Sequence, residues 1–170
     1  AANGVKDITE VVYKIEGEDL FLVGTAEHTL VGLNKDKTLN NKDLPVKLCA
    51  LTACFRKEIG SHGVDTKGLF RMHQFNKVEQ VVISRPENSF KMLEEMQKIT
   101  EEFFKSMKIP YRVIEICSGD LSPKFAKQYD IEAWFPRQNK YAEVTSAGNC
   151  TDFQSRALNI KFTDKDERKL

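Results

Sequence analysis

Two short apolar segments near the N-terminus predict a β-hairpin. Val11, Tyr13 and Ile15 recur at every second position, and an apolar run at positions 20–23 follows the glycine-containing turn at positions 17–19. Alternation with a period of two is typical of a half-buried strand, and a turn between two such runs favours a hairpin. We therefore expect the first two elements to be paired strands.

Two longer segments, residues 46–58 and 70–84, are apolar and rich in residue types that favour strands. The segment between them, 59–69, holds three glycines among polar residues. Long connections inside a compact domain are usually functional or mobile. We therefore expect a long hairpin over about 46–84 with a functional or mobile loop.

Residues 86–107 carry the clearest helical pattern. Pro86 suits the first turn of a helix, and apolar residues then recur at steps of three and four. Shorter helices are expected after the capping residues Thr25 and Thr151, ending at positions 33 and 158. The long stripe predicts a helix that packs one face on a sheet, and its positions are Phe90, Leu93, Met96 or Gln97, Thr100, Phe103, Phe104 and Met107.

Further strands are expected at positions 111–117, 131–135, 141–145 and 160–162. Strands therefore outnumber the helices that could connect parallel strands. This favours an α+β fold in which helices flank an antiparallel β-sheet. Residues 1–170 contain no linker and no repeat, which indicates a single domain.

Composition adds a few constraints. The 170 residues are 41% hydrophobic and 30% charged, as in ordinary soluble domains. With 26 basic and 25 acidic residues the formal charge is +1, so any contact with nucleic acid has to be local. No apolar stretch reaches the roughly 20 residues of a membrane span, and we expect a cytoplasmic protein without membrane contact. The four scattered cysteines are expected to be reduced and mostly buried.

Charged residues alternate along the second long strand. A period of two places Arg71, His73, Phe75, Lys77 and Glu79 on one face. Spacing alone supports two interpretations of this face. One is a functional site, and the other is a solvated outer face with cross-strand salt bridges, as in a plain antiparallel interaction domain.

Three sequence blocks together resemble one enzyme family. They are TAEH at 25–28, CFRKEIGSHGVDTKGLFRMHQFNKVEQ at 54–80 and NKYAEVTSAGNCTDFQSR at 139–156. The middle block resembles motif 2 of the class II aminoacyl-tRNA synthetases, and its amino-acid sequence is similar to that of archaeal-type seryl-tRNA synthetases. The resemblance covers nearly all of residues 10–162, with the blocks in the family's order and at its approximate spacing.

The resemblance implies activation of serine by ATP and Mg²⁺ to seryl-adenylate, followed by transfer of serine to serine tRNA. Family members are homodimers. The family's N-terminal tRNA-binding coiled coil, its motif 1 and its motif 3 have no recognisable counterpart in residues 1–170. We therefore expect a partial, truncated catalytic domain. The alternative is a non-catalytic paralogue that binds an amino acid, a nucleotide or a protein partner.

The resemblance also implies roles for single residues. Arg56 would contact the α-phosphate and the serine carboxylate, Glu58 the adenine amino group and Arg71 the triphosphate, and these are the expected catalytic residues. Phe75 would stack on adenine. The expected ATP site comprises Arg56, Lys57, Glu58, Arg71, Phe75, Glu143, Val144, Thr145 and Ser146, of which Glu143 and Ser146 would coordinate Mg²⁺ through ATP. The expected serine site comprises Thr25, Ala26, Glu27, Arg56 and Glu79, with Glu79 on either the ammonium or the hydroxyl group.

Overall fold

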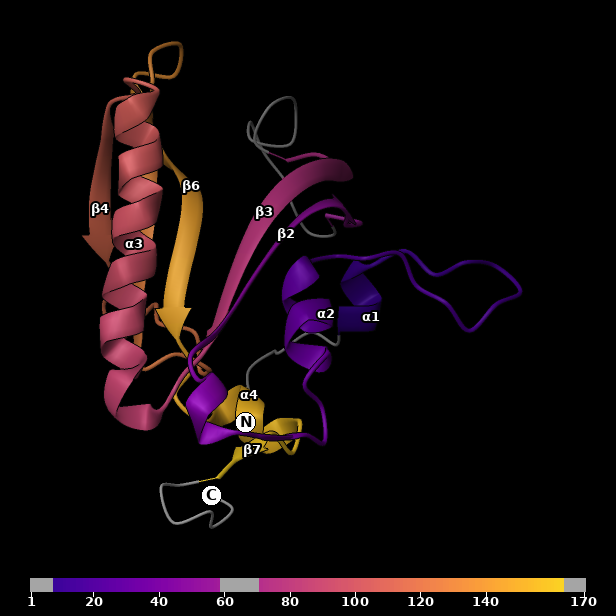
Figure 1. Ribbon diagram of the computed structural model, residues 1–170. Coiled ribbons are helices and arrows are strands. Elements are labelled where there is room, and N and C mark those ends of the chain that lie inside the picture. Colours follow the sequence, from indigo (N-terminus) through magenta and orange to yellow (C-terminus); the bar gives the residue numbers. More distant parts are fainter. Residues whose placement is uncertain (1–7, 59–70, 164–170) are drawn as a thin grey trace. The chain divides into compact units, whose positions relative to one another are not determined.

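The computed structural model describes residues 8–58 and 71–163 (Figure 1). The chain forms two compact units, the first from residues 1–33 and 48–81 and the second from residues 34–47 and 82–170. The loop expected at 59–69 falls outside the described residues. The expectation of a single domain over residues 1–170 stays a prediction.

The first unit contains two short helices, α1 (Ile8–Val11) and α2 (Ala26–Gly32). It also holds most of a two-stranded sheet of β2 (Val46–Phe55) and β3 (Gln74–Ile83). Both long strands were predicted, and each is shorter than expected at the end next to the loop.

Thr25 caps α2 as predicted. Its backbone is extended, with φ at −167°, and its Oγ1 accepts the backbone N–H of Glu27 at 3.2 Å. A side-chain oxygen at this position satisfies one of the N–H groups that the first helical turn leaves unpaired. Glu27 in the first turn adds a negative charge where the helix dipole favours one.

The predicted N-terminal strands are wrong. Val11 ends a helix, and a single β-bridge joins Lys14 to Phe21. Backbone bonds from Ile15 N to Leu20 O and from Leu22 N to Tyr13 O close the turn. A two-stranded ribbon needs a buried apolar face to extend further, whereas the apolar side chains from Leu20 to Val23 are exposed here.

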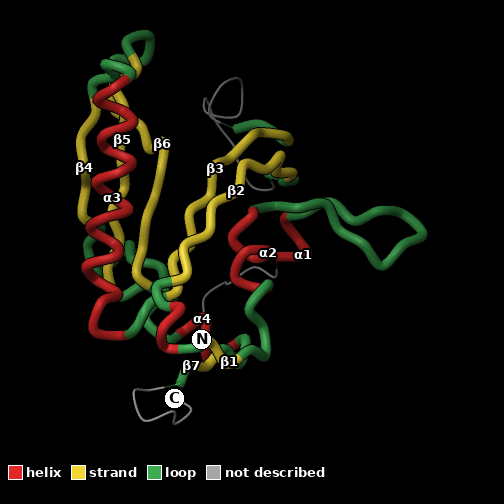
Figure 2. Tube along the Cα trace, in the orientation of Figure 1, coloured by secondary structure: helices red, strands yellow, loops and turns green. Residues whose placement is uncertain are grey.

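The second unit is built on an antiparallel sheet in the order β4-β5-β6, comprising β4 (Tyr111–Glu115), β5 (Lys127–Phe135) and β6 (Lys140–Asn149). A 3₁₀ turn, η3 (Pro86–Asn88), leads into helix α3 (Ser89–Ser106), which packs against β6. Figure 2 shows this helix in red along the yellow strands. The predicted α+β class with antiparallel pairing is confirmed.

The apolar stripe of α3 is only partly buried. Leu93, Gln97 and Phe104 are buried, whereas Phe90 and Phe103 are 49% and 57% exposed. Phe103 still meets the edge of the Phe104 ring, with 5.7 Å between the centroids. Part of the predicted core face is therefore exposed in the described second unit.

The last elements of the second unit are α4 (Phe153–Ala157) and β7 (Lys161–Phe162). Asp152, not the predicted Thr151, precedes α4 as its N-cap residue. Thr151 has a φ of +47°, in the left-handed region, and lies in the turn before the helix. β7 pairs in parallel with β1 (Thr38–Leu39), a strand that the sequence pattern did not indicate, and η1 (Asn41–Asp43) follows β1.

The cysteines are free, and the expectation that most are buried is wrong. Cys54 is completely buried, Cys150 is intermediate, and Cys49 and Cys117 are exposed. Cys49 lies on the exposed side of a two-stranded sheet, where alternate residues face solvent. Among the described helices, none is long and apolar enough to cross a membrane.

Candidate active site

The charged face of β3 is the more protected face of this strand. Phe75, Lys77 and Glu79 are partly buried, whereas the residues between them are exposed, with Val78 at 62%. A merely solvated outer face would show the opposite pattern, with charged residues in water and valine inside. The burial pattern therefore favours the functional interpretation of this strand.

Thr25, Lys77 and Glu79 form one closed network. The Thr25 hydroxyl donates to Glu79 Oε2 at 2.9 Å, and Lys77 Nζ donates to Thr25 Oγ1 at 2.7 Å. Lys77 Nζ also lies 2.5 Å from Glu79 Oε2. The network joins the first turn of α2 to β3, so it brings together two residues predicted for the serine site.

Arg56, just beyond β2, is anchored beside this network. Its Nε donates to the carbonyl oxygen of Gly24 at 2.9 Å, and its guanidinium carbon lies 5.3 Å from the centroid of the Phe75 ring. The neighbouring backbone bond from Phe55 N to Val23 O, at 2.7 Å, holds the two segments together. The terminal guanidinium nitrogens each carry two N–H groups, which suit oxygen ligands.

Gly24 is required by this close approach. A Cβ at this position would lie 2.6 Å from Cγ1 of Val12, a buried side chain. Atoms of different residues do not normally come so close, so a larger residue would have to displace either Val12 or the carbonyl that holds Arg56.

Glu58 and Arg71 pair with each other where the two strands meet the loop. Arg71 donates to Glu58 Oε2 at 2.7 Å. Glu58 has a φ of +49°, in the left-handed region that residues other than glycine, asparagine and aspartate seldom occupy. Such backbone strain clusters at functional sites, where the surrounding structure holds it in place. The backbone N–H of the adjacent Lys57 donates to Val11 O at 2.7 Å, and this bond helps to fix the backbone next to Glu58.

In the second unit, helix α3 covers one face of the three-stranded sheet. Tyr129 and Lys127 of β5 donate to Glu94 Oε1 of α3 at 2.8 and 3.1 Å. The Tyr129 hydroxyl, followed by Lys127, holds the pKa of Glu94 below its ordinary value, against a smaller opposing effect of burial. Odd-numbered residues of β5 therefore face the helix, and even-numbered residues point to the opposite face.

Glu143 and Ser146 of β6 lie on the face away from α3. They stand opposite Glu132 and Asp130, and residues that are directly opposite in an antiparallel pair share a face. Glu143 and Ser146 are both exposed. The pair predicted for Mg²⁺ is therefore on one surface of the second unit.

A β-bulge makes this arrangement possible. In a regular strand, residues three positions apart point to opposite faces. The register shifts here, because Thr145 pairs with Ile131 while Glu143 pairs with Glu132, and Val144 is the extra residue. Bulges of this kind redirect side chains and are frequent next to active sites.

Sequence reasoning missed two polar neighbours of Ser146. Gln128 Nε2 donates to Ser146 Oγ and to Asp130 Oδ1, both at 3.0 Å, and Asp130 is buried. The signal was present in the sequence, since Gln128, Asp130 and Glu132 alternate with apolar or aromatic residues. The sequence analysis placed Lys77 on the same face as Phe75 and Glu79 but assigned it no role.

The predicted site residues fall into two sets, one on each unit. The second unit holds the β6 set, Glu143, Val144, Thr145 and Ser146. Across residues 8–58 and 71–163, no group of three or more His, Cys, Asp and Glu side chains could hold a metal ion. The first unit holds Thr25, Ala26, Glu27, Arg56, Lys57, Glu58, Arg71, Phe75 and Glu79.

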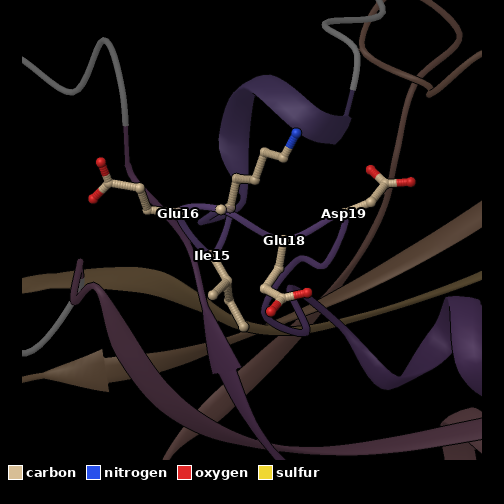
Figure 3. Close-up of a pocket in the computed structure, with 6 residues that line it drawn as sticks. Ile15, Glu16, Glu18 and Asp19 are labelled. Carbon is tan, nitrogen blue, oxygen red and sulfur yellow. The ribbon is translucent and has the colours of Figure 1, made fainter.

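A hollow of about 480 Å³ lies in the turn at residues 14–19 (Figure 3). It is lined by this turn alone and by none of the predicted site residues. The carboxylates of Glu16 and Asp19 point away from each other, so they do not converge on one ligand. The hollow is open surface around a turn, and the polar face of β3 remains the candidate site.

Comparison with known proteins agrees with these features. Residues 11–170 match the family described as tRNA synthetase class II core domain (G, H, P, S and T). The serine–tRNA ligase of Pyrococcus furiosus is 54% identical over 164 residues, which cover 96% of this chain and 36% of that protein. The serine–tRNA ligase of Methanoregula boonei is 51% identical over 160 residues, which cover 94% of this chain and 38% of that protein.

Two solved structures share the fold closely. The seryl-tRNA synthetase from Pyrococcus horikoshii complexed with ATP superposes with a TM-score of 0.90 at 54% identity, over 96% of this chain and 37% of that one. The cytoplasmic serine–tRNA ligase from Naegleria fowleri in complex with AMP gives a TM-score of 0.86 at 41% identity. The match covers 96% of this chain and 40% of that one.

The chain thus spans between one third and two fifths of the length of these relatives. The family match extends over almost the whole chain and includes all three sequence blocks and every predicted site residue. The chain therefore belongs to the class II tRNA synthetase core domain family.

Proposed function

We propose that this chain is the serine-activating part of a seryl-tRNA synthetase. In the reaction the serine carboxylate attacks the α-phosphorus of ATP, an acyl–phosphate bond forms, and pyrophosphate leaves with the broken phosphoanhydride bond. The observation that carries the proposal is the protected polar face of β3, where Phe75, Lys77 and Glu79 lie beside Thr25 and Arg56. A non-catalytic paralogue would not need to keep this set intact.

Arg56, Glu58 and Arg71 are the proposed catalytic residues. Arg56 would hold an oxygen of the α-phosphate and one of the serine carboxylate, since a guanidinium can bind two oxygens at once. Its bond to Gly24 fixes the side chain before substrate arrives. Such positioning, with stabilisation of charge on phosphate oxygens, is the main contribution an enzyme makes to this type of reaction. Glu58 would accept the adenine amino group, and Arg71 would contact the triphosphate.

Phe75 would provide the stacking surface for adenine. We propose ATP as the nucleotide because one structural relative is complexed with ATP and another with AMP. Lys57, Val144 and Thr145 complete the proposed ATP-binding set.

Glu143 and Ser146 are the proposed Mg²⁺ ligands. A carboxylate and a hydroxyl on one face suit this ion, which typically takes one or two carboxylates and completes its shell with water and substrate phosphates. Ser146 Oγ accepts from Gln128, and its second lone pair is free to coordinate. When bound, the ion would neutralise phosphate charge, while Glu143 and Ser146 would keep it on this surface.

The proposed serine site comprises Thr25, Ala26, Glu27, Arg56 and Glu79. Thr25 and Glu27 would lie near the ammonium group, Arg56 at the carboxylate, and Glu79 at the ammonium or the hydroxyl group. A pocket that hydrogen-bonds a substrate hydroxyl can reject an analogue without it by a factor of about 10⁴–10⁵.

For the longer protein, we propose serine tRNA as the second substrate, a homodimeric assembly and a cytoplasmic location. The formal charge of +1 on this chain supplies little of the positive field that usually attracts nucleic acid. The affinity for tRNA would therefore come mainly from other parts of the protein.

The test is serine-dependent exchange of labelled pyrophosphate into ATP. This assay measures activation without tRNA, so it depends only on the adenylate-forming step. We expect exchange that needs serine, and a loss of exchange in an Arg56→Ala variant. Exchange driven equally well by several amino acids, or a full-length protein without exchange, would refute the proposal.

A further inference from the structure

Lys77 has no role in the proposed function, yet it lies at the centre of the serine site. Its ammonium group contacts Glu79 Oε2 at 2.5 Å and Thr25 Oγ1 at 2.7 Å. The side chains of Lys77 and Glu79 are 31% and 20% exposed, and Thr25 is buried. Taking an ion pair partly out of water costs desolvation energy, which close geometry and additional hydrogen bonds have to offset.

The hydroxyl of Thr25 has no capacity left for a ligand. A threonine hydroxyl can donate one hydrogen bond and accept two. Oγ1 accepts from the Glu27 N–H and from Lys77, and it donates to Glu79. Neither Lys77 nor the backbone N–H can accept, so the direction of all three bonds is fixed. A substrate ammonium group could bind this oxygen only if Lys77 moved away.

The carboxylate of Glu79 is oriented by the same two partners. Its contacts with Thr25 and Lys77, both within the described part of the chain, end on Oε2. Oε1 is therefore the oxygen that can face a substrate. Because Lys77 compensates the charge, a second ammonium group beside Glu79 would gain little attraction and would be repelled by Lys77.

We propose that Lys77 is a positioning residue that makes Glu79 a receptor for the serine hydroxyl and excludes the serine ammonium from it. This inference rests on the proposed function and resolves the two alternatives for Glu79. The ammonium group of serine would then bind in the part of the serine site where Glu27 lies. Lys77 does not touch the reacting atoms, and it acts through Thr25 and Glu79.

The experiment measures the binding of two stable adenylate analogues, seryl-sulfamoyladenosine and alanyl-sulfamoyladenosine, which differ only in the hydroxyl group. Calorimetric titrations compare the wild-type chain with Lys77→Met. Lys98→Met is the matched control, because Lys98 lies on α3 with its side chain 78% exposed. Circular dichroism melting verifies the fold of each variant.

We expect Lys77→Met to weaken binding of the seryl analogue about tenfold or more, as for the loss of a charged hydrogen-bond partner. Binding of the alanyl analogue should change much less, so the preference for serine should fall. Lys77→Gln keeps a hydrogen-bond donor without the charge and should lose a smaller part of this preference. It also provides a second variant if the methionine variant does not fold.

Three results would overturn the inference. Equal weakening of both analogues would mean that Lys77 supports the ammonium site or only the fold. Tighter binding by Lys77→Met would mean that Lys77 occupies the substrate's place in the free protein. Unchanged binding would remove its role altogether. Failure of the wild-type chain to bind the seryl analogue would instead refute the proposed function, and the inference with it.

Discussion

The guanidinium of Arg56 lies over the ring of Phe75, with its central carbon 5.3 Å from the ring centroid. These residues come from the two strands on either side of the loop, and the resemblance assigns one to phosphate and the other to adenine. A cation held over an aromatic face by an independent anchor, here the Gly24 carbonyl, is fixed in direction as well as in distance. The two groups proposed to bind substrate are therefore held in a fixed arrangement by contacts within the protein.

Replacement of Phe75 by alanine should weaken ATP binding and leave the fold intact. Stacking of a base on an aromatic ring is worth about 1–3 kcal/mol, and Phe75 is only partly buried. The measurement is ATP affinity by titration calorimetry, with circular dichroism as the check on folding. Phe153→Ala is the control, because Phe153 is 48% exposed on α4. An unchanged affinity in a folded Phe75→Ala variant would exclude the stacking role.

Replacement of Arg56 by lysine should lower the turnover of adenylate formation more than the affinity for ATP. Lysine keeps the positive charge but cannot hold two oxygens and the Gly24 carbonyl together. The loss of a donor that stabilises transition-state charge costs about 100-fold or more in turnover. Pyrophosphate exchange at varied ATP gives kcat and KM separately. A matching substitution, Arg156→Lys on exposed α4, should change neither, and a raised KM with an unchanged kcat for Arg56→Lys would indicate uniform binding instead.

Replacement of Gly24 by alanine should destabilise the first unit and displace Arg56. The new methyl group would lie 2.6 Å from Cγ1 of the buried Val12, and overpacking of this kind costs about 1–3 kcal/mol. Urea unfolding measures the loss. Gly32→Ala provides the control, because a Cβ there would meet nothing within 4 Å and alanine favours the helix. Equal stability of the two variants would show that the approach at Gly24 is easily relieved.

The contact between Glu94 and Tyr129 should make the free energy of unfolding depend on pH in the acidic range. The pKa of Glu94 is below its ordinary value of 4.5 in the folded protein, through the Tyr129 hydroxyl first and Lys127 second. The contribution is therefore fully present above about pH 4.5 and is lost as the pH falls through the folded-state pKa. Since Glu94 is largely exposed, we expect an effect below about 1 kcal/mol.

The variant Tyr129→Phe should reduce this acid dependence. Urea unfolding at pH 6 and at pH 3, compared between wild type and variant, isolates the contribution of the hydroxyl group. The difference in stability between wild type and Tyr129→Phe should be larger at the higher pH. A difference that is the same at both pH values would show that the hydroxyl acts only by packing.

Local signals in the sequence accounted for the features that depend on local contacts. Thr25 caps α2 because the hydroxyl bonds a backbone N–H only two residues away. The polar alternation along β3 correctly placed Phe75 and Glu79 on one face, because a strand keeps its period wherever it lies. Whether that face was protected depended on neighbours from other segments, which spacing does not reveal.

Features that depend on distant partners were missed or wrong. The N-terminal hairpin carries a strand pattern, but no third strand covers it in the described first unit, so its pairing stops at one bridge. β1 became a strand only because β7, from the other end of the chain, lies beside it. Lys77 was placed on the correct face but received no role, because its contact with Thr25 joins residues that are far apart in the sequence.

The bulge at Val144 determines which residues of β6 point to the same face of the sheet. Glu143 and Ser146 are separated by an odd number of positions, and they reach the same surface only because one residue between them is not counted in the pairing. One more residue that joined the pairing between Glu143 and Ser146 would keep the carboxylate, the hydroxyl and every other ligand in the sequence, and would still send the two groups to opposite sides of the sheet. At this position the information lies in the number of residues that the pairing counts, and an insertion that changed this number would be more harmful than a change of side chain.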